Sequence, residues 1–401
     1  MKKNVMKTLV FALLVSTGFT LASCDDENKV NPDVEIVDTE LGSYVSGIVT
    51  DGSAPLSGVT VSAGEQSATT DASGTYTLPA SAGSVSVSAA LDGYVSATRS
   101  VTVTETGVAT LDFELTPRNA SQTLTPDGEL QITEEIDKVT SMTFPAGAVS
   151  ENTEVSITEY RAETQPDNVG ALSVVYCEPD GQEFAQPVRV EIAKSTSGEV
   201  AFADMKHYVQ DASGEWVEEG DVTLEDDRYV TELTHFSNHA FGAAAQWSAA
   251  SGQDGESTTI EIDNLGSLSA SSEEVSVSAR SGWEVDGDLA SIVSTALSGV
   301  SQSDAAALAS DLNRMLRNAK GTSSNAASRT VSLGTVEVSG DTRATITVTQ
   351  RITSRTMSVS VVFRGSPVTV TVPVIEYGGA DMSVSYEYGD LRPEHSGGEI
   401  G

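Results

Sequence analysis

Short runs in which apolar and polar residues alternate recur along most of the chain. Residues 59–62 read Val-Thr-Val-Ser, and residues 75–78 read Thr-Tyr-Thr-Leu. Successive side chains of a strand point to opposite faces, so each run can bury one face. Turn residues separate the runs at intervals of roughly eight to twelve positions, which is typical of sandwiches and barrels. Over 401 residues the pattern predicts a mainly β protein: tandem β-sandwich domains followed by a C-terminal α+β domain.

The first residues carry targeting information. Three lysines precede an apolar stretch at 8–15, the layout of a secretory signal peptide, and the stretch is too short to span a bilayer. Residues 21–24, Leu-Ala-Ser-Cys, resemble the bacterial lipobox, whose cysteine receives a diacylglycerol. The resemblance implies a signal peptide at 1–23 and lipid attachment at Cys24. The alternative is ordinary signal cleavage that leaves a free cysteine.

Residues 24–41 are polar and acidic and predict a lipidated, disordered tether. Asp25, Asp26 and Glu27 directly after the cysteine resemble the acidic tag that sends some Gram-negative lipoproteins to the cell surface. In other lineages an aspartate there retains the protein in the inner membrane. We expect an outer-membrane protein that faces the cell exterior. Its contact with the membrane is expected to be the N-terminal lipid anchor.

The chain is strongly acidic. It has 22 basic and 58 acidic residues, a formal charge of −36, and removal of the three leader lysines changes this to −39. Such a field repels nucleic acid, so we expect no nucleic-acid partner. We interpret the acidic composition as a source of solubility outside the cell; a specific cation-binding role is the alternative. With Cys24 alkylated, Cys177 has no partner for a disulfide, and its strand-like surroundings predict a buried structural thiol.

Residues 42–116 contain a series of recognisable segments. These are 46–51, 54–61, 69–78, 91–94 and 111–115. Together they resemble the carboxypeptidase regulatory-like family, which implies a small prealbumin-like β-sandwich that some classifications group with carbohydrate-binding folds. Within it, Asp71-Ala72-Ser73-Gly74 predicts a turn; calcium binding by Asp71 is the alternative, and a single acid is weak support for it. Tyr76 is expected in the core.

Residues 120–243 carry a second resemblance. The segments that carry it are 142–149, 153–157, 187–192, 216–217 and 229–237. Their order resembles the ZU-five-like domain of netrin receptors and ankyrins, a β-sandwich used for protein interaction. The turn Phe144-Pro145-Ala146-Gly147-Ala148 and the triplet His235-Phe236-Ser237 are its most recognisable points.

That triplet carries a chemical hypothesis through the resemblance. In some relatives the bond before the serine cleaves itself, which implies attack of the Ser237 hydroxyl on the Phe236 carbonyl with His235 as base. The favoured alternative is a strand end with Phe236 in the core. His235 and His239 are four residues apart, but no helical pattern surrounds them and no glutamate lies between them, so we assign no metal site.

The C-terminal part changes character. Residues 244–258 are rich in Ala, Ser and Gly and predict a linker. Within an α+β domain at 259–390, Ser303-Asp304 can cap a helix whose stripe includes Leu308, Leu312, Met315 and Leu316, and residues 292–300 suggest a shorter helix before it. Residues 391–401 are expected to form a flexible tail.

Four arginines stand out in this acidic chain. They are Arg343, Arg351, Arg355 and Arg364. On one sheet face they would form a positive patch for an anionic ligand. The favoured alternative is charge balancing on a solvated sheet.

No nucleophile elbow, phosphate-binding glycine loop or paired carboxylates in a recognisable context are present. The sequence therefore predicts no enzyme, no catalytic residues and no cofactor, but a surface protein that binds or displays an extracellular glycan or protein ligand. A carbohydrate-binding module of a glycan-utilisation system is the main alternative, and a self-cleaving ZU-five-like protein is a further one. We expect the C-terminal domain to carry the ligand contact.

Overall fold

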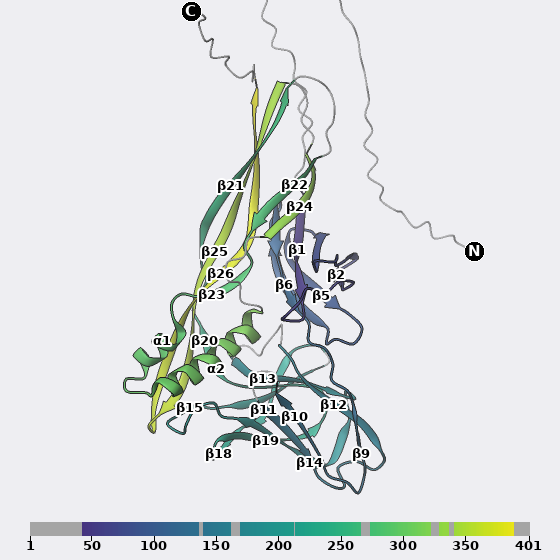
Figure 1. Cartoon of the computed structure of the whole chain (residues 1–401), viewed down its shortest axis with the longest axis vertical. Coiled ribbons are helices and arrows are strands. Elements are labelled where there is room, and N and C mark those ends of the chain that lie inside the picture. Colours follow the sequence, from purple (N-terminus) through teal and green to yellow (C-terminus); the bar gives the residue numbers. More distant parts are fainter. Residues whose placement is uncertain are drawn as a thin grey trace, which may run out of the picture. The chain divides into compact units, whose positions relative to one another are not determined.

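The computed structural model describes residues 42–135, 139–161, 169–211, 213–265, 273–321, 329–336 and 341–388. Within them the protein is mainly β, with two helices between β23 (Gly282–Val285) and β24 (Arg329–Val336) (Figure 1). The predicted leader, the lipidated tether with Cys24, and the tail at 391–401 lie outside the described residues. Neither described helix has the length and apolar character of a membrane span.

The N-terminal segment is a two-sheet sandwich with its own core. Its strands are β1 (Ser43–Thr50), β2 (Thr60–Ala63), β3 (Gln66–Thr69), β4 (Thr75–Pro79), β5 (Gly83–Ala90), β6 (Ala97–Val103), β7 (Gly107–Thr110) and β8 (Phe113–Glu114). One sheet runs β4-β1-β7, with β8 also on β1, and the other runs β3-β2-β5-β6. The alternation seen in the sequence buries Val59, Val61, Tyr76 and Leu78, so Tyr76 is a core residue as predicted.

Asp71 forms the predicted turn. Its Oδ1 accepts hydrogen bonds from the Ser73 amide, the Ser73 hydroxyl and the Thr75 amide, at 2.8–2.9 Å. These hydrogen bonds, led by the one from the Ser73 side chain, lower the pKa of Asp71. Gly74 follows with a positive φ of 73°, a conformation that glycine adopts without strain.

The middle segment contains two further sets of strands. They are β9 (Gln122–Leu124), β10 (Leu130–Glu135), β11 (Val139–Phe144), β12 (Thr153–Glu159), β13 (Val169–Glu178), β14 (Glu183–Ala193), β15 (Val200–Phe202), β16 (Lys206–Gln210), β17 (Trp216–Asp221), β18 (Thr223–Glu225), β19 (Arg228–His235) and β20 (Asn238–Trp247). One sheet has the order β10-β11-β14-β19-β18. The opposing strands pair as β9-β12-β13-β20, and β16 pairs with both β20 and β17. Cys177 is fully buried on β13, as predicted, and burial raises the pKa of its thiol.

The C-terminal segment is built on a long hairpin. Its elements are β21 (Ser251–Leu265), β22 (Glu273–Ala279), β23 (Gly282–Val285), α1 (Leu289–Ala296), α2 (Gln302–Lys320), β24 (Arg329–Val336), β25 (Asp341–Phe363) and β26 (Ser366–Tyr388). The hairpin strands β25 and β26 pair along their whole length, and β21 pairs with the other edge of β25 (Figure 1). The positive φ of 77° at Gly365 belongs to the turn that joins β25 to β26.

Both predicted helices are present, with a different cap on the longer one. Leu308, Leu312, Met315 and Leu316 all lie buried on one face of α2. The Ser301 hydroxyl caps α2 by accepting from the Asp304 amide at 3.0 Å, so the cap lies two residues before the predicted Ser303. An N-cap needs a side chain that reaches the third amide of the helix, and Ser301 is the residue at that distance.

The predicted linker is replaced by strand. Most of 244–258 belongs to β20 and β21, and β20 crosses from the middle segment to pair with β25, where Trp247 lies opposite Met357. In this stretch Ala245 is fully buried and a Cβ at Gly255 would lie 2.8 Å from the Gln350 carbonyl oxygen, whereas residues 248–252 are exposed. Composition alone suggested flexibility because Ala, Ser and Gly are frequent in linkers, and composition does not reveal that the stretch pairs with β25.

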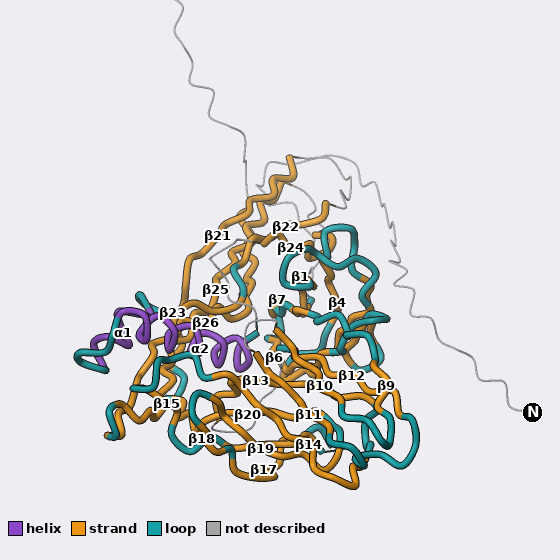
Figure 2. The backbone as a smooth tube through the Cα atoms, turned by 60° about the horizontal axis from the view of Figure 1, so that its bottom comes forward, coloured by secondary structure: helices purple, strands orange, loops and turns teal. Residues whose placement is uncertain are grey.

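The middle and C-terminal segments share one hydrophobic core. A single cluster of buried residues extends from Leu124 on β9 to Val374 on β26 and includes both helices. Strand β15 also pairs with β25, and α2 lies against β13 (Figure 2). The boundary predicted between residues 120–243 and 259–390 therefore does not separate two hydrophobic cores.

Candidate functional site

The triplet His235-Phe236-Ser237 lies at the junction of β19 and β20. Phe236 is fully buried, and its ring packs edge-on against Phe144 and Phe184 at centroid distances of 5.7 and 4.9 Å. Its amide and carbonyl are both hydrogen-bonded, to the Gln182 carbonyl and the Gly181 amide. The phenyl ring thus acts as a core anchor where the chain passes from one strand to the next.

The polar members of the triplet point to other partners. The Ser237 hydroxyl donates to the Gln210 carbonyl at 3.3 Å, and His235 Nδ1 lies 3.4 Å from Glu219 Oε1. Within the described residues, no hydrogen bond joins His235 to the Ser237 hydroxyl that the self-cleavage hypothesis activates. Self-cleavage stays a prediction, and the observed packing supplies the strand-end role.

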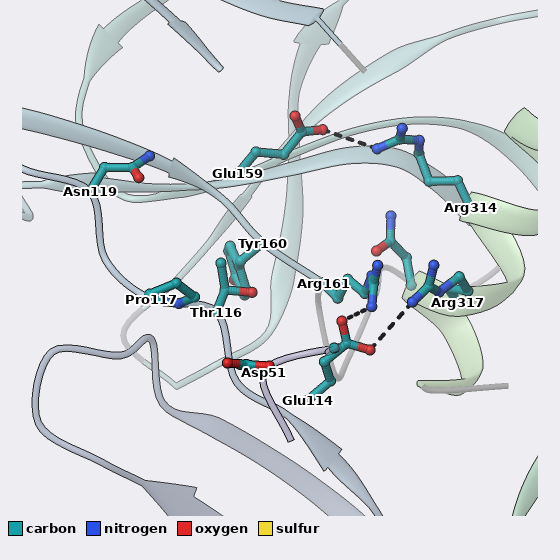
Figure 3. A pocket seen from close by; sticks show the side chains of 12 residues that line it. Asp51, Glu114, Thr116, Pro117, Asn119, Glu159, Tyr160, Arg161, Arg314 and Arg317 are labelled. Atoms are coloured by element: carbon teal, nitrogen blue, oxygen red, sulfur yellow. Dashed lines mark hydrogen bonds and ion pairs between the residues drawn. The ribbon is translucent and has the colours of Figure 1, made fainter. Parts of the chain in front are cut away.

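A pocket of about 360 Å³ brings charged side chains together from three regions of the sequence (Figure 3). The charged residues that line it are Asp51, Glu114, Glu159, Arg161, Arg314 and Arg317. Two come from the N-terminal sandwich, two from the end of β12 and the residues after it, and two from α2. A volume of this size is within the range of about 300–1,000 Å³ usual for small-molecule sites.

The charges in the pocket are paired. Glu114 forms ion pairs with Arg161 and, at 3.4 Å, with Arg317, while Glu159 pairs with Arg314 at 3.4 Å (Figure 3). Glu114 and Glu159 are both buried. A buried carboxylate without a partner would be costly, so these pairs hold the guanidinium groups in fixed positions.

Helix α2 is held tightly enough to position its arginines. The Asn318 amide donates to the Ala171 carbonyl at 2.8 Å in a buried contact. At the other end of the helix, the Asp304 carboxylate accepts from the amide and hydroxyl of Ser197 at 2.8 and 2.7 Å, and these bonds lower the pKa of Asp304. Met315 packs on Gly170, where there is no side chain to separate helix and strand.

The N-terminal sandwich contributes a rigid turn to the pocket. Asp51 Oδ1 accepts from the Ala54 and Ser53 amides at 2.7 and 2.9 Å, and these bonds lower the pKa of Asp51. Gly52 has a φ of 89°, and a Cβ there would overlap the Glu114 carboxylate. Only glycine allows this turn to approach Glu114 so closely.

The arrangement can both donate and accept hydrogen bonds at fixed places. Arginine donates only, and carboxylate accepts only; Asn119 and Tyr160 add an amide and a phenol to the lining. Because each guanidinium group already has a carboxylate, an anionic ligand must compete with Glu114 and Glu159. A neutral ligand with many hydroxyl groups meets no such competition.

Sequence analysis did not identify this pocket. Its residues are widely separated in sequence. Asp51 and Glu114 belong to segments that carry the family resemblance, but nothing in those segments indicates that they line a pocket. The sequence assigned the ligand contact to the C-terminal domain, but the pocket uses that domain only through α2. The sequence of α2 predicts its apolar face, but it does not indicate which groups Arg314 and Arg317 contact on the polar side.

The arginines noted on the C-terminal strands are also neutralised. Arg351 pairs with Asp381 at 3.5 Å, Arg355 with Glu376 at 3.6 Å, and Arg364 with Glu199 at 3.1 Å. The side chain of Arg343 lies outside the described residues. For the three described arginines, the structure supports charge balancing.

Solved structures align with most of this chain, but their backbones superpose poorly on it. One such chain is a candidate pore-forming toxin from Bacteroides vulgatus, with 11% identity, coverage of 90% of this chain and 96% of that chain, and a TM-score of 0.31. Another is a candidate membrane-associated protein of unknown function from Bacteroides fragilis, with 11% identity, coverage of 86% and 98%, and a TM-score of 0.29. No curated protein matches the sequence. Residues 44–116 match the carboxypeptidase regulatory-like domain, which confirms the resemblance seen in the sequence of this segment.

Proposed function

We propose that the chain is a non-catalytic binding protein, held at the outer membrane by a lipid on Cys24, and that its pocket binds a polar, hydroxyl-rich extracellular ligand such as a saccharide. The observation that carries this proposal is the set of paired charges in the pocket. Fixed donors and acceptors side by side suit vicinal hydroxyl groups, which both donate and accept. The ZU-five-like resemblance of residues 120–243 remains a prediction beside it.

A protein ligand is the second candidate from the sequence. Large protein contacts on a monomer usually show as an exposed apolar patch of several hundred Å². In the described part of the chain, the large hydrophobic side chains that are exposed are Val217 and Leu224. The polar pocket therefore favours a small polar ligand over a protein.

A glycan array probed with the mature chain, followed by calorimetric titration of the bound glycan, tests the proposal. Arg317→Met removes one guanidinium group of the pocket and keeps the aliphatic stem. Loss of a charged hydrogen-bond donor costs about 1.5–3 kcal/mol, so binding should weaken by about 10- to 100-fold. Lys320→Met is the matched control, because Lys320 lies three residues further along α2 and pairs with Glu376 at 2.8 Å.

Two results would refute the pocket assignment. One is that the array binds nothing, and the other is that R317M and K320M bind the glycan equally well. Affinity should also change little between about 0.1 and 1 M salt, since a neutral ligand has no charge to screen. A steep loss of affinity with salt would indicate an anionic ligand instead.

The anchor is tested separately. Cys24→Ala should release the protein from the membrane fraction, because the lipid is the only attachment that the sequence predicts. The measurement is the distribution of the protein between the membrane pellet and the soluble fraction without detergent. Retention of C24A in the pellet would contradict lipid anchoring and leave the pocket assignment untouched.

A further inference from the structure

Three histidines and one glutamate come together in the middle segment, and none of them lines the charged pocket. His207 lies on β16, Glu219 on β17, His239 on β20, and His235 at the end of β19. His207 Nε2 is 2.9 Å from His239 Nδ1 and 3.4 Å from Glu219 Oε2. One ligand atom from each of these three residues lies within 4.8 Å of the others.

The strand register explains how residues so far apart in sequence converge. His207 pairs with Phe241 and Val209 pairs with His239 across β16 and β20, so both histidines project from the same face. On the other side of β16 the register shifts: His207 lies opposite Gly220 and Tyr208 opposite Glu218. Glu219 is the extra residue of this bulge.

A bulge of this kind redirects a side chain. Here it brings the Glu219 carboxylate toward His207, at a position where Gly220 has no side chain to occupy the space. The carboxylate is 31% exposed, whereas the two histidines are buried. The cluster therefore has a buried imidazole side and a side open to solvent.

Burial of both rings favours the neutral form of each imidazole. Burial, followed by the nearby His235, lowers the pKa of His207 to about 4. Burial and the neighbouring histidines also hold the pKa of His239 well below its usual range. A neutral imidazole has a free lone pair on one nitrogen, which is the form that binds a metal ion.

We propose that His207 Nε2, His239 Nδ1 and the Glu219 carboxylate bind one divalent transition-metal ion, with Zn²⁺ the ion that suits the donor set. Two imidazoles and one carboxylate are common zinc ligands. Bonds of about 2.0–2.1 Å in a tetrahedral site place ligand atoms about 3.3 Å apart. Two of the three observed separations, 2.9 and 3.4 Å, are close to this value. The third, between His239 Nδ1 and the Glu219 carboxylate, lies within 4.8 Å, and rotation of the partly exposed Glu219 side chain can shorten it.

Metal binding at His239 Nδ1 would exchange one hydrogen bond for another, because the ring proton would move to Nε2, which then cannot accept from the Ser237 amide. Without metal, the Ser237 amide donates to His239 Nε2 at 3.1 Å, which leaves the ring proton on Nδ1, facing His207. Metal binding requires that proton to leave Nδ1. The His235 backbone, which hydrogen-bonds the same ring, can then accept a proton carried on the other nitrogen, as backbone carbonyls do for metal-binding histidines.

His235 acts as a positioning residue. Its Nδ1 lies 3.4 Å from Glu219 Oε1, the carboxylate oxygen that does not face His207. A partner of this kind orients a metal-binding carboxylate. The fourth tetrahedral position is left to water on the solvent side.

A bound ion would fasten an edge strand to the core. Among the described strands, β17 pairs with β16 alone, and Glu219 would link it through the metal to β20. Because only the folded chain brings these ligands together, metal binding should stabilise the fold.

The test uses the full mature chain, treated with a chelator and then titrated with Zn²⁺. We expect one tightly bound ion per chain, a rise in melting temperature, and the visible absorption of tetrahedral Co²⁺ when cobalt replaces zinc. Glu219→Gln should weaken Zn²⁺ binding by at least about 100-fold, since even a supporting partner contributes about 10- to 100-fold. His235→Asn should show the smaller effect.

Glu218→Gln is the matched control. Glu218 is adjacent on β17 but pairs with Lys206 at 3.3 Å, so E218Q should bind Zn²⁺ as the unaltered chain does. Both glutamates are exposed, so neither variant should disturb folding. The proposal is overturned if the unaltered chain binds no Zn²⁺ below about 10 µM, weaker than structural zinc sites, or if E219Q and E218Q bind it equally.

Discussion

The contact between α2 and β13 depends on Gly170, and its replacement by alanine is a stringent test of the described packing. A Cβ at Gly170 would lie 3.0 Å from Met315 Sδ and 3.4 Å from Met315 Cβ and Cγ. The backbone of Gly170 is not in the left-handed region, so an alanine there meets a steric obstacle without backbone strain. Overpacking of this kind costs about 1–3 kcal/mol. Because a methionine side chain is flexible, we expect a value near the lower end.

A double-mutant cycle separates this contact from other effects. Met315 is fully buried, so Met315→Ala alone should cost about 2–5 kcal/mol through the cavity that it leaves. In the double variant the alanine at 170 occupies part of that cavity. The cost should then be smaller than the sum of the single costs by about 0.5 kcal/mol or more.

Urea denaturation of the four proteins measures these free energies. Gly252→Ala is the control, because a Cβ there meets nothing closer than 3.9 Å, and its effect should stay within about 0.5 kcal/mol. If the costs at 170 and 315 simply add, the two residues do not touch as described. The docking of α2, and with it the positions of Arg314 and Arg317, would then be incorrect.

Three other predictions address separate parts of the chain. The folded-state pKa of His207 is lowered from 6.5 to about 4, so the unfolded chain takes up a proton first as the pH falls. The metal-free protein should therefore lose about 3 kcal/mol of unfolding free energy between about pH 6.5 and pH 4. The variant H207Q should lose less in the same titration. Phe236→Ala should cost about 3–5 kcal/mol, and the purified chain should run as one intact band; fragments that meet between Phe236 and Ser237 and disappear in S237A would establish self-processing instead. Gly52→Ala should lower the melting temperature and weaken glycan binding, because its Cβ would overlap Glu114; unchanged binding would show that the turn does not shape the pocket.

Local pattern was sufficient where neighbours in sequence are neighbours in space. Alternation at Val59 and Val61 placed both in a core, Asp71 formed its turn with residues two and four positions away, and the apolar stripe of α2 predicted which side chains are buried. These features follow from strand and helix periods and from short-range hydrogen bonds. The mainly β class followed from the same periods.

Pairing between strands that are distant in sequence could not be predicted from local pattern. The Ala-Ser-Gly stretch read as a linker forms β20 and β21 because its strands find β25 about a hundred residues later. Of the small residues that suggested flexibility, Ala245 is fully buried and Gly255 lets β21 lie close to Gln350 on β25. The shared core of the middle and C-terminal segments has the same origin.

Both candidate sites show which features the sequence predicts and which depend on the tertiary structure. The sequence by itself determined the charge of the chain, the predicted leader and anchor, the strand-rich class and the family of residues 44–116. Only the tertiary structure decided that Arg317 reaches Glu114 and that His207 faces His239. The physical reason is that a side chain's chemistry is local, whereas its partners are set by register: a bulge of one residue at Glu219 and the docking of α2 on a glycine bring together groups that no spacing in the sequence connects.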